Sequence, residues 1–376
     1  MHKVSLLASL LSSFYFFYFG VVGVYVIFLP KVLSLSGYTP SEIGIIFAAA
    51  PLVRFVVPFA FARGLKLNRK SFNIALTIML ISATSFYFSI ESFTSLLVSN
   101  IGLGIGLSLI LPYIEFISLS RIGKENYGKI RLFGSLGFVL VALVLVKFLE
   151  GASIALAFLL ILSILTACVA FIIAKGSNKV LDKSEEVSND ISLLRDYKLW
   201  IGLTLMQISF GAFYNFFTIY ETDFGLSMDM TIYLWSFGVF AEIVMLYYQG
   251  RFLANNLLLI LQITTAATAF RWFLLYMFPQ NLPLLFFAQS IHALSFALFH
   301  SAAISYLFSH YAHKSLAQQF FSGITYGMGA FIGALYAGYI YEWFARELFL
   351  SASFIAAFAT LFLALWSKDQ ACQKSD

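Results

Sequence analysis

The chain has 376 residues, of which 61% are hydrophobic and only 11% carry a charge. A soluble domain has about 25% charged residues, so this chain has too few of them to cover a water-facing surface. The composition therefore excludes an ordinary soluble enzyme and indicates a chain that faces lipid. The net charge of +5 does not indicate a nucleic-acid partner, because the basic residues fall in short segments between apolar runs.

Apolar runs of membrane-spanning length follow one another along the whole chain. A helix needs about 20 predominantly apolar residues to cross a bilayer. The predicted helices cover, in chain order, residues 5–33, 41–62, 71–90, 94–119, 132–149, 152–174, 198–220, 229–250, 255–278, 282–308, 315–341 and 347–366. The sequence therefore predicts an all-α integral membrane protein with twelve transmembrane helices. The first run is too long for a cleavable signal peptide, so we expect it to be retained as a helix.

A polar stretch at residues 175–196 separates the sixth predicted helix from the seventh. It carries many charged residues and shows no apolar periodicity, so we interpret it as a cytoplasmic linker. The chain is therefore predicted to consist of an N-terminal six-helix bundle at residues 1–174 and a C-terminal six-helix bundle, with a short cytoplasmic tail, at residues 197–376.

The two predicted bundles resemble each other. Residues 37–43 supply a turn and an N-cap candidate before the second helix, and residues 225–231 supply the same features before the eighth helix, 188 residues later. The helices that precede these turns both carry aromatic clusters. Two six-helix pseudo-repeats of this kind are the construction of one class of secondary transporters.

The distribution of Lys and Arg predicts the orientation of the chain, because cytoplasmic loops carry an excess of both residues. If the N-terminus is cytoplasmic, only Lys31, Lys147 and Arg346 fall on the opposite side, while Arg54 and Arg271 fall within predicted helices. All the other Lys and Arg residues then face the cytoplasm. We therefore expect a multi-pass protein of the cell inner membrane with both termini in the cytoplasm.

Five ionisable side chains are predicted to lie within the membrane: Arg54, Glu115, Glu242, Arg271 and His292. A charge at the centre of a membrane helix costs roughly 2.5–3.5 kcal/mol on insertion scales, so such residues usually face a cavity or a partner. The 188-residue offset places Arg54 and Glu242 at equivalent positions of the two repeats. A central ion pair, two poles around a substrate, and a contact that only fixes how the halves dock all remain open.

Glu242, Arg271 and His292 form the sharper group. An arginine near a carboxylate favours the ionised acid, and separating the two groups allows the acid to take a proton. Histidine titrates in the physiological range. These residues are therefore our candidates for proton coupling, and a static hydrogen-bonded network between their helices is the alternative.

Glu115 and Arg131 are predicted to lie on neighbouring antiparallel helices, close enough for their side chains to meet. Pro112 precedes Glu115 and loosens its helix toward a cavity. The alternative is that Arg131 only extends its side chain from a helix end to the interface. His300, which stands between Phe299 and Ser301, is a sixth and weaker candidate, for which we favour packing over function.

No motif for catalysis or metal binding is visible. The two cysteines, Cys168 and Cys372, have no metal-site or disulfide spacing. No Walker loop, zinc-protease motif or nucleophile elbow occurs. We therefore expect no enzyme activity, no bound metal and no cofactor.

Several stretches together match a known family. They are Tyr127 to Phe138, Gly44 to Ala50 with Arg54 beyond it, Leu234 to Glu242, Phe270 to Trp272, and Gln289 with His292. The first resembles the signature of helices 4 and 5 in the lactose permease and phenylpropionate permease branch of the major facilitator superfamily. The stretches of the second half resemble the phenylpropionate permease type most closely.

This resemblance implies the major facilitator fold and a solute:proton symporter. It implies that Glu115 and Arg131 bind substrate, and that Glu242, Arg271 and His292 couple transport to the proton. Two departures from lactose permease matter. Ser295 stands where a proton-carrying glutamate is expected, and Phe138 stands in place of a sugar-stacking tryptophan, which argues against a galactoside.

Together these features predict a secondary active transporter that works by alternating access. We expect proton-coupled symport, driven by the transmembrane proton gradient, of a small organic solute such as an aromatic carboxylate. Arg54 and Arg271 suit an anion, while Phe138 and Tyr214 suit its apolar body, although aromatic runs are more often lipid-facing or core. A nucleoside or sugar:proton symporter is the alternative, and a membrane-embedded sensor or enzyme is more remote. We expect a functional monomer.

Overall fold

The computed structural model describes residues 2–63, 68–122, 124–148, 151–175, 191–254 and 256–375, which are helices joined by short turns and contain no strand. These residues form two compact units, Met1–Lys183 and Ser184–Asp376. Most of the predicted linker, at 176–190, lies outside the described residues.

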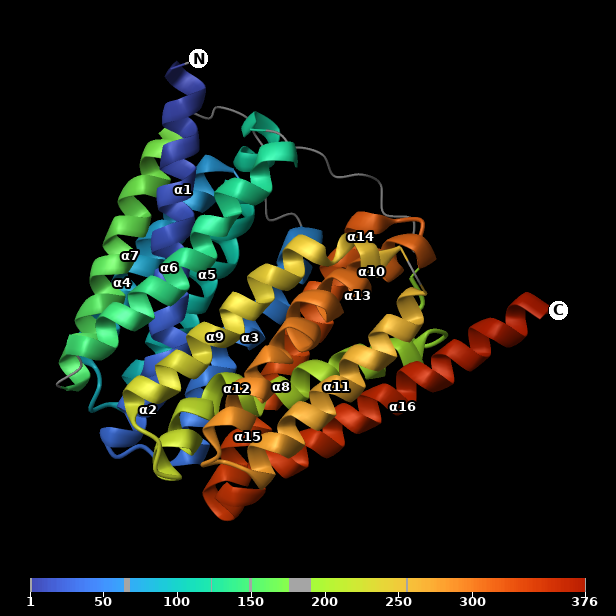
Figure 1. The fold of residues 1–376 in the computed structure, drawn as a ribbon. Helices are drawn as coiled ribbons and strands as arrows, with labels where there is room; N and C mark the ends of the chain where they lie inside the picture. The colour runs from blue at the N-terminus through green and yellow to red at the C-terminus, as the bar shows by residue number, and fades with distance from the viewer. Residues whose placement is uncertain are drawn as a thin grey trace. The chain divides into compact units, whose positions relative to one another are not determined.

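The N-terminal unit is a bundle of long helices. Its elements are α1 His2–Gly23, η1 Val24–Phe28, α2 Leu29–Leu35, α3 Pro40–Ala62, α4 Arg69–Phe88, α5 Phe93–Ile122, α6 Lys124–Phe148 and α7 Ala152–Lys175. Helix α1 packs along α6 and α7, while α5 packs against α3 and α4 (Figure 1). The candidate residues of this unit lie on three of these helices, with Arg54 on α3, Glu115 on α5, and Arg131 and Phe138 on α6.

The C-terminal unit is also a helix bundle. Its elements are α8 Tyr197–Asp223, α9 Met228–Tyr248, α10 Gly250–Leu253, α11 Leu257–Met277, α12 Leu282–Ser290, η2 Ala293–Leu298, α13 Phe299–His310, α14 Lys314–Phe320, η3 Phe321–Gly329, α15 Ala330–Phe344, η4 Ala345–Glu347 and α16 Leu348–Ser375. Helix α8 packs against α15 and α16, and α11 packs against α16 and α13. Helices α9 and α12 and the segment η2 are also in contact.

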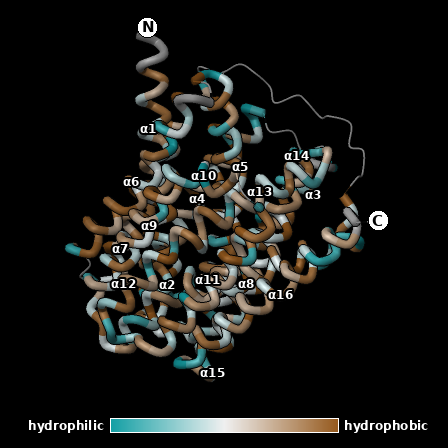
Figure 2. The backbone as a smooth tube through the Cα atoms, turned by 45° about the vertical axis from the view of Figure 1, so that its right-hand side comes forward, coloured by the Kyte–Doolittle hydropathy of each residue, from teal (hydrophilic) through white to brown (hydrophobic). Residues whose placement is uncertain are grey.

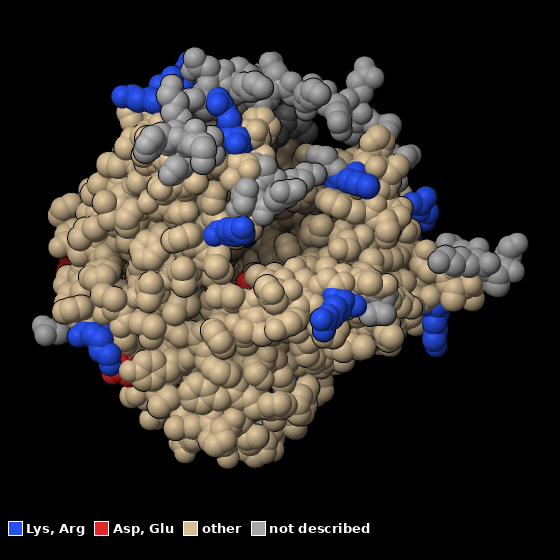
Figure 3. Space-filling model, turned by 45° about the horizontal axis from the view of Figure 1, so that its top comes forward, with Lys and Arg blue, Asp and Glu red and all other residues tan. Residues whose placement is uncertain are grey.

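The helices are suited to a bilayer. Among the described residues, ten helical stretches are long and apolar enough to cross a membrane, the last of them running from Leu316 to Cys372. Helix α8 is a further candidate, and the last stretch consists of two helices that meet at η4. With these two additions the helices are consistent with twelve crossings. Figure 2 shows apolar residues along the helices, and large side chains such as Phe88, Phe240 and Phe354 are exposed. The face drawn in Figure 3 is largely uncharged, with Lys and Arg more evident than acidic groups.

The two units share a turn at equivalent positions. Gly37 has a φ of 92° and Gly225 a φ of 101°, and the two residues are 188 positions apart. Each closes a turn after a helix, since the amide of Gly37 donates to Ser34 and that of Gly225 donates to Thr222. Glycine takes this left-handed conformation without the steric penalty that other residues meet. This shared backbone geometry agrees with the predicted pseudo-repeat.

Within the described part of the chain, three helices contain π-helical segments. These are η1 in the first helix, η2 immediately after His292, and η3 before α15. A π-helical turn widens the helix, and such turns occur frequently at functional sites. The segment η2 therefore singles out the end of α12 as a place to look for function.

Candidate functional site

A buried arginine lies within the C-terminal unit. Arg271 of α11 is 0% exposed. Its Nη1 donates to Nδ1 of His292 at 2.9 Å, and its Nη2 donates to Oε1 of Gln289 at 2.8 Å. Gln289 and His292 are three residues apart near the end of α12, and this spacing places them on one face of the helix. The guanidinium thus ties α11 to α12 through two hydrogen bonds.

The hydrogen bond from Arg271 determines the tautomer of His292. A guanidinium has only donors, so Nδ1 of His292 accepts and the ring proton lies on Nε2. Nε2 faces Oε2 of Glu242 on α9 at 3.8 Å, within ion-pair range but longer than a hydrogen bond. The side chain of Glu242 is 17% exposed. His292 therefore lies between a cation and a carboxylate, as a neutral ring that presents its N–H to the acid.

Aromatic rings of α8 and α11 surround this arginine. The guanidinium carbon lies 4.3 Å from the ring centroid of Phe213 and 4.5 Å from that of Trp272. Both distances are within the range of about 6 Å over which a cation is attracted to a ring face. Tyr214 belongs to the same cluster, with its ring 5.4 Å from Phe210 and 6.4 Å from Trp235. The rings partly compensate for burying the charge.

Two hydrogen-bond donors at this site are unsatisfied. Nε of Arg271 and Nε2 of Gln289 are buried and have no hydrogen-bond partner within the described ranges. Buried polar groups are nearly always hydrogen-bonded, and an unmade bond costs about 1–3 kcal/mol. No carboxylate of the described residues lies within ion-pair distance of Arg271. Chemically, this arrangement is suited to an anion with two acceptor oxygens.

A second polar group lies in the N-terminal unit. The hydroxyl of Tyr127 donates to Oε1 of Glu115 at 3.1 Å, and Nε of Arg131 lies 3.7 Å from the same oxygen. The guanidinium of Arg131 also lies 4.0 Å from the ring centroid of Phe19 on α1 and 5.4 Å from that of Tyr15. The side chains of Glu115 and Arg131 are each 32% exposed. The structure thus brings Glu115 and Arg131 together, as the sequence predicted, and adds Tyr127 and the α1 rings.

The remaining candidates make other contacts. Arg54 of α3 is an exposed residue, and its predicted relation to Glu242 would join the two units and stays a prediction. Phe138 packs beside Gly23 of α1. Nδ1 of His300 lies 2.8 Å from the hydroxyl of Tyr326. At the position where an acid was expected, the hydroxyl of Ser295 donates to the carbonyl of Ile291 at 3.0 Å.

Sequence reasoning assigned no role to Gln289 or Tyr127, although both occur in the motifs that carry the resemblance. For Gln289 the sequence held a weak signal, because this residue lies one helical turn before His292. Over the described ranges, no group of three or more His, Cys, Asp or Glu residues is arranged to hold a metal ion. Cys168 and Cys372 are both exposed.

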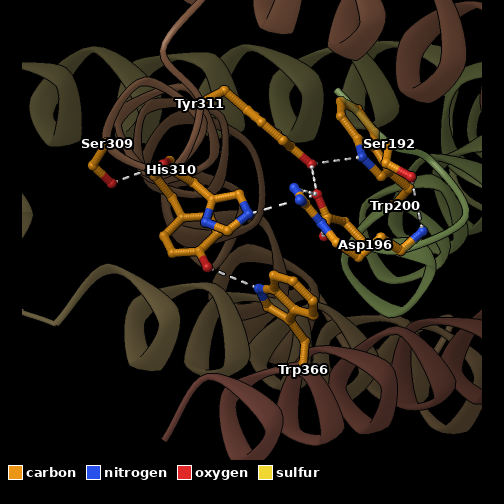
Figure 4. Close-up of polar contacts among 9 residues, drawn as sticks. Ser192, Asp196, Trp200, Ser309, His310, Tyr311 and Trp366 are labelled. Carbon is orange, nitrogen blue, oxygen red and sulfur yellow. Dashed lines mark hydrogen bonds and ion pairs between the residues drawn. The ribbon is translucent and has the colours of Figure 1, made fainter. Parts of the chain in front are cut away.

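A cluster around Asp196 was missed altogether, because this residue was assigned to the linker. Asp196 is only 1% exposed and precedes α8. Its carboxylate accepts hydrogen bonds from the hydroxyl of Tyr311 at 2.7 Å and from Nε of Arg195 at 2.9 Å (Figure 4). Nε1 of Trp200 donates to the same tyrosine hydroxyl at 3.1 Å, and Nε2 of His310 lies 3.6 Å from the carboxylate. The cluster ties the start of α8 to the end of α13.

Burial and hydrogen bonding act in opposite directions on this acid. Burial raises the pKa of Asp196, but the hydrogen bonds from Arg195 and Tyr311 and the nearby charges lower it, and the pKa ends below its usual value. The signal in the sequence was an aspartate directly before an apolar helix, with Trp200 one turn later.

Comparison with known proteins matches the chain to one transporter family and to proteins described as transporters or drug-resistance proteins. The model of the MFS_1 like family matches residues 8–351. The probable 3-phenylpropionic acid transporter of Escherichia coli K12 is 25% identical over 360 residues, covering 91% of this chain and 93% of that protein. Quinolone resistance protein NorA of Staphylococcus aureus is 27% identical over 353 residues, covering 87% of this chain and 88% of NorA.

Solved structures agree in fold. The nucleoside transporter NupG superposes with a TM-score of 0.80 at 16% identity, covering 96% of this chain and 99% of NupG. An auto-inhibited peptide transporter of the POT family gives a TM-score of 0.74 at 11% identity, covering 98% of this chain and 96% of the other.

Proposed function

We propose that this protein carries a small organic carboxylate together with a proton. The premise is that the chain belongs to the MFS_1 like family and is a multi-pass membrane transporter, not an enzyme. The observation that carries the proposal is the pair of buried, unsatisfied donors on Arg271 and Gln289. The relative from Escherichia coli supports the substrate class, because its name specifies 3-phenylpropionic acid, an aromatic carboxylate.

A carboxylate supplies what Arg271 lacks. Its two oxygens accept hydrogen bonds, and its charge compensates a guanidinium that has no carboxylate within ion-pair distance among the described residues. The rings of Phe213, Tyr214 and Trp272 around the guanidinium offer an apolar surface to the body of an aromatic acid. Because Arg271 is fully buried, substrate reaches it only after the helices around it have moved.

Proton coupling follows from the same contacts. While Arg271 donates to Nδ1 of His292, that nitrogen cannot take a proton. When a carboxylate draws the guanidinium away, Nδ1 becomes free to bind a proton, and the imidazolium is stabilised by Glu242. Anion binding thus favours proton binding, and the pair moves without net charge. Movement through the membrane is by alternating access.

The remaining expectations belong to the same proposal. In the N-terminal unit, the Glu115, Tyr127 and Arg131 group contributes to substrate binding. The protein resides in the inner membrane with both termini in the cytoplasm and acts as a monomer. The transmembrane proton gradient supplies the energy.

Uptake in proteoliposomes tests the proposal. We expect 3-phenylpropionate to accumulate when the lumen is alkaline, and accumulation to stop when an ionophore collapses the pH gradient. An Arg271→Lys variant keeps the charge but loses the planar fork that contacts both His292 and Gln289, so its uptake should fall at least tenfold. Arg251→Lys, on an exposed arginine of α10, is the matched control. Uptake that ignores the gradient, or uptake of an uncharged nucleoside in place of the acid, contradicts the proposal.

A further inference from the structure

A second buried acid lies in the C-terminal unit, away from the residues assigned above. Glu221, in the last turn of α8, is 0% exposed. Neither of its side-chain oxygens has a hydrogen-bond partner among the residues that the structure describes. Acidic residues are almost never fully buried unless they are paired, so this carboxyl group requires an explanation.

The surroundings of Glu221 are apolar and aromatic. Tyr220, next to it, packs against Phe224 at 4.4 Å and against Phe349 of α16 at 4.8 Å between ring centroids. The backbone carbonyl of Glu221 accepts from the amide of Leu226 at 2.9 Å, which closes the turn that contains Gly225. The residue is also at the C-terminal end of a helix, where the helix dipole disfavours a negative charge.

The charged and titratable groups at this end of the unit are engaged with other partners. The hydroxyl of Tyr341 on α15 donates to the exposed Asp223 at 2.8 Å, and that of Tyr220 donates to the carbonyl of Arg346 at 3.4 Å. The guanidinium of Arg346 lies 5.9 Å from the ring centroid of Tyr276. The groups that interact electrostatically with Tyr220 or Tyr341 are Glu221 itself, Asp223, Tyr276, Arg346 and Glu347. Within the described ranges no cation pairs with Glu221.

An ionised carboxylate at this position would be a buried charge without a counterion and without a single hydrogen-bond donor. Such a charge costs far more than a buried neutral polar group. The neutral carboxylic acid is the form that this environment tolerates. We infer that Glu221 is a proton-binding site, which holds its proton in this conformation and releases it only when the end of α8 opens to water.

The route for release is short along the chain. Asp223, two residues later, is exposed and holds the hydroxyl of Tyr341. Local opening of the last turn of α8 would expose Glu221, since Asp223 in the same turn is already exposed. Proton binding at Glu221 does not require transport, whereas its use in the transport cycle rests on the proton coupling proposed above.

Infrared spectroscopy of the purified protein in lipid tests proton binding directly. At neutral pH we expect the carbonyl stretch of a protonated carboxylic acid, which Glu221→Gln removes and Glu221→Asp shifts. Glu115→Gln and Glu242→Gln identify any contribution from the other two intramembrane acids, and Glu91→Gln, in an exposed turn, is the matched control. A spectrum without a protonated acid, or a band that remains unchanged in both Glu221 variants, overturns the inference. The two variants guard against a loss of folding in one of them.

Transport by Glu221→Gln then separates the two proposals. If Glu221 releases its proton during the cycle, the variant should lose its response to the pH on the side to which α8 opens, while binding of 3-phenylpropionate is retained. A variant that lacks the infrared band but has an unchanged pH profile overturns the role in transport. The carboxylate proposal can fail independently. In that case the wild-type protein neither binds nor transports 3-phenylpropionate but still shows the infrared band.

Discussion

His292 is held so that its protonation depends on a neighbouring arginine. Nδ1 accepts from Arg271 at 2.9 Å, while Nε2 faces Glu242 at 3.8 Å. A cation at one nitrogen disfavours a proton on the ring, and an acid at the other favours it. Any event that moves the guanidinium therefore changes the affinity of the histidine for a proton. At the scale of the residue, this contact is the physical link between an anionic solute and a proton.

Glu242→Gln tests that link. The substitution keeps the shape of the side chain and removes the charge that stabilises a protonated His292. We expect uphill uptake of 3-phenylpropionate driven by a pH gradient to fall at least tenfold, while exchange of solute across the membrane continues, because exchange needs no net proton movement. Counterflow and gradient-driven uptake in the same proteoliposomes measure the two. Loss of both, with normal folding, contradicts a coupling role, and Glu91→Gln should behave like the wild type.

Asp196 joins two elements, since it precedes α8 and bonds Tyr311 at the end of α13. Its pKa is lower in the folded protein than its usual value. The ionised acid therefore stabilises the fold above the unfolded-state pKa, and this stability is lost as the pH falls through the folded-state pKa. Asp196→Asn should remove about 1–3 kcal/mol at neutral pH and flatten the acid limb of the unfolding temperature against pH. An unchanged acid limb, followed by intrinsic tryptophan fluorescence, contradicts this assignment.

Close packing of α1 on α6 depends on a glycine. A Cβ atom on Gly137 would collide with the backbone carbonyl of Phe16, which has little freedom to move. Gly137→Ala should therefore lower stability by about 1–3 kcal/mol, as overpacking does in other cores. Gly128→Ala on the same helix is the matched control, because nothing lies within 4 Å of the position that its Cβ would take. Equal unfolding temperatures for the two variants would exclude the predicted steric role of Gly137.

The helices could be predicted from the sequence, whereas the network around Asp196 could not. A bilayer requires runs of apolar residues, so each helix leaves a plain pattern in the chain. Glu115 with Arg131, and Arg271 with His292, could be nominated because charge is rare in such runs. Hydrogen bonds between distant elements leave no such pattern. Tyr311, Trp200 and Asp196 are common residue types near helix ends, and only the folded chain brings them together.

Glu221 shows the same difficulty at the scale of the whole molecule. It stands one residue beyond the predicted span that ends at Tyr220, so it is not among the ionisable residues expected within the membrane. In the structure α8 extends to Asp223, and packing by α15 and α16 covers this end of the helix. Burial there depends on how the whole C-terminal bundle packs, which a window of sequence does not contain.

The orientation of the whole chain is open to a direct test. The excess of Lys and Arg predicts cytoplasmic termini, and Cys372 is an exposed residue near the C-terminus. A membrane-impermeant maleimide should therefore label Cys372 in inverted vesicles and leave it unlabelled in intact cells. Cys168 lies within α7, where lipid should exclude the polar reagent, so Cys168→Ser should label like the wild type and Cys372→Ser should not label. Labelling of Cys372 from outside intact cells would reverse the predicted topology, and with it the side from which each proposed proton site is reached.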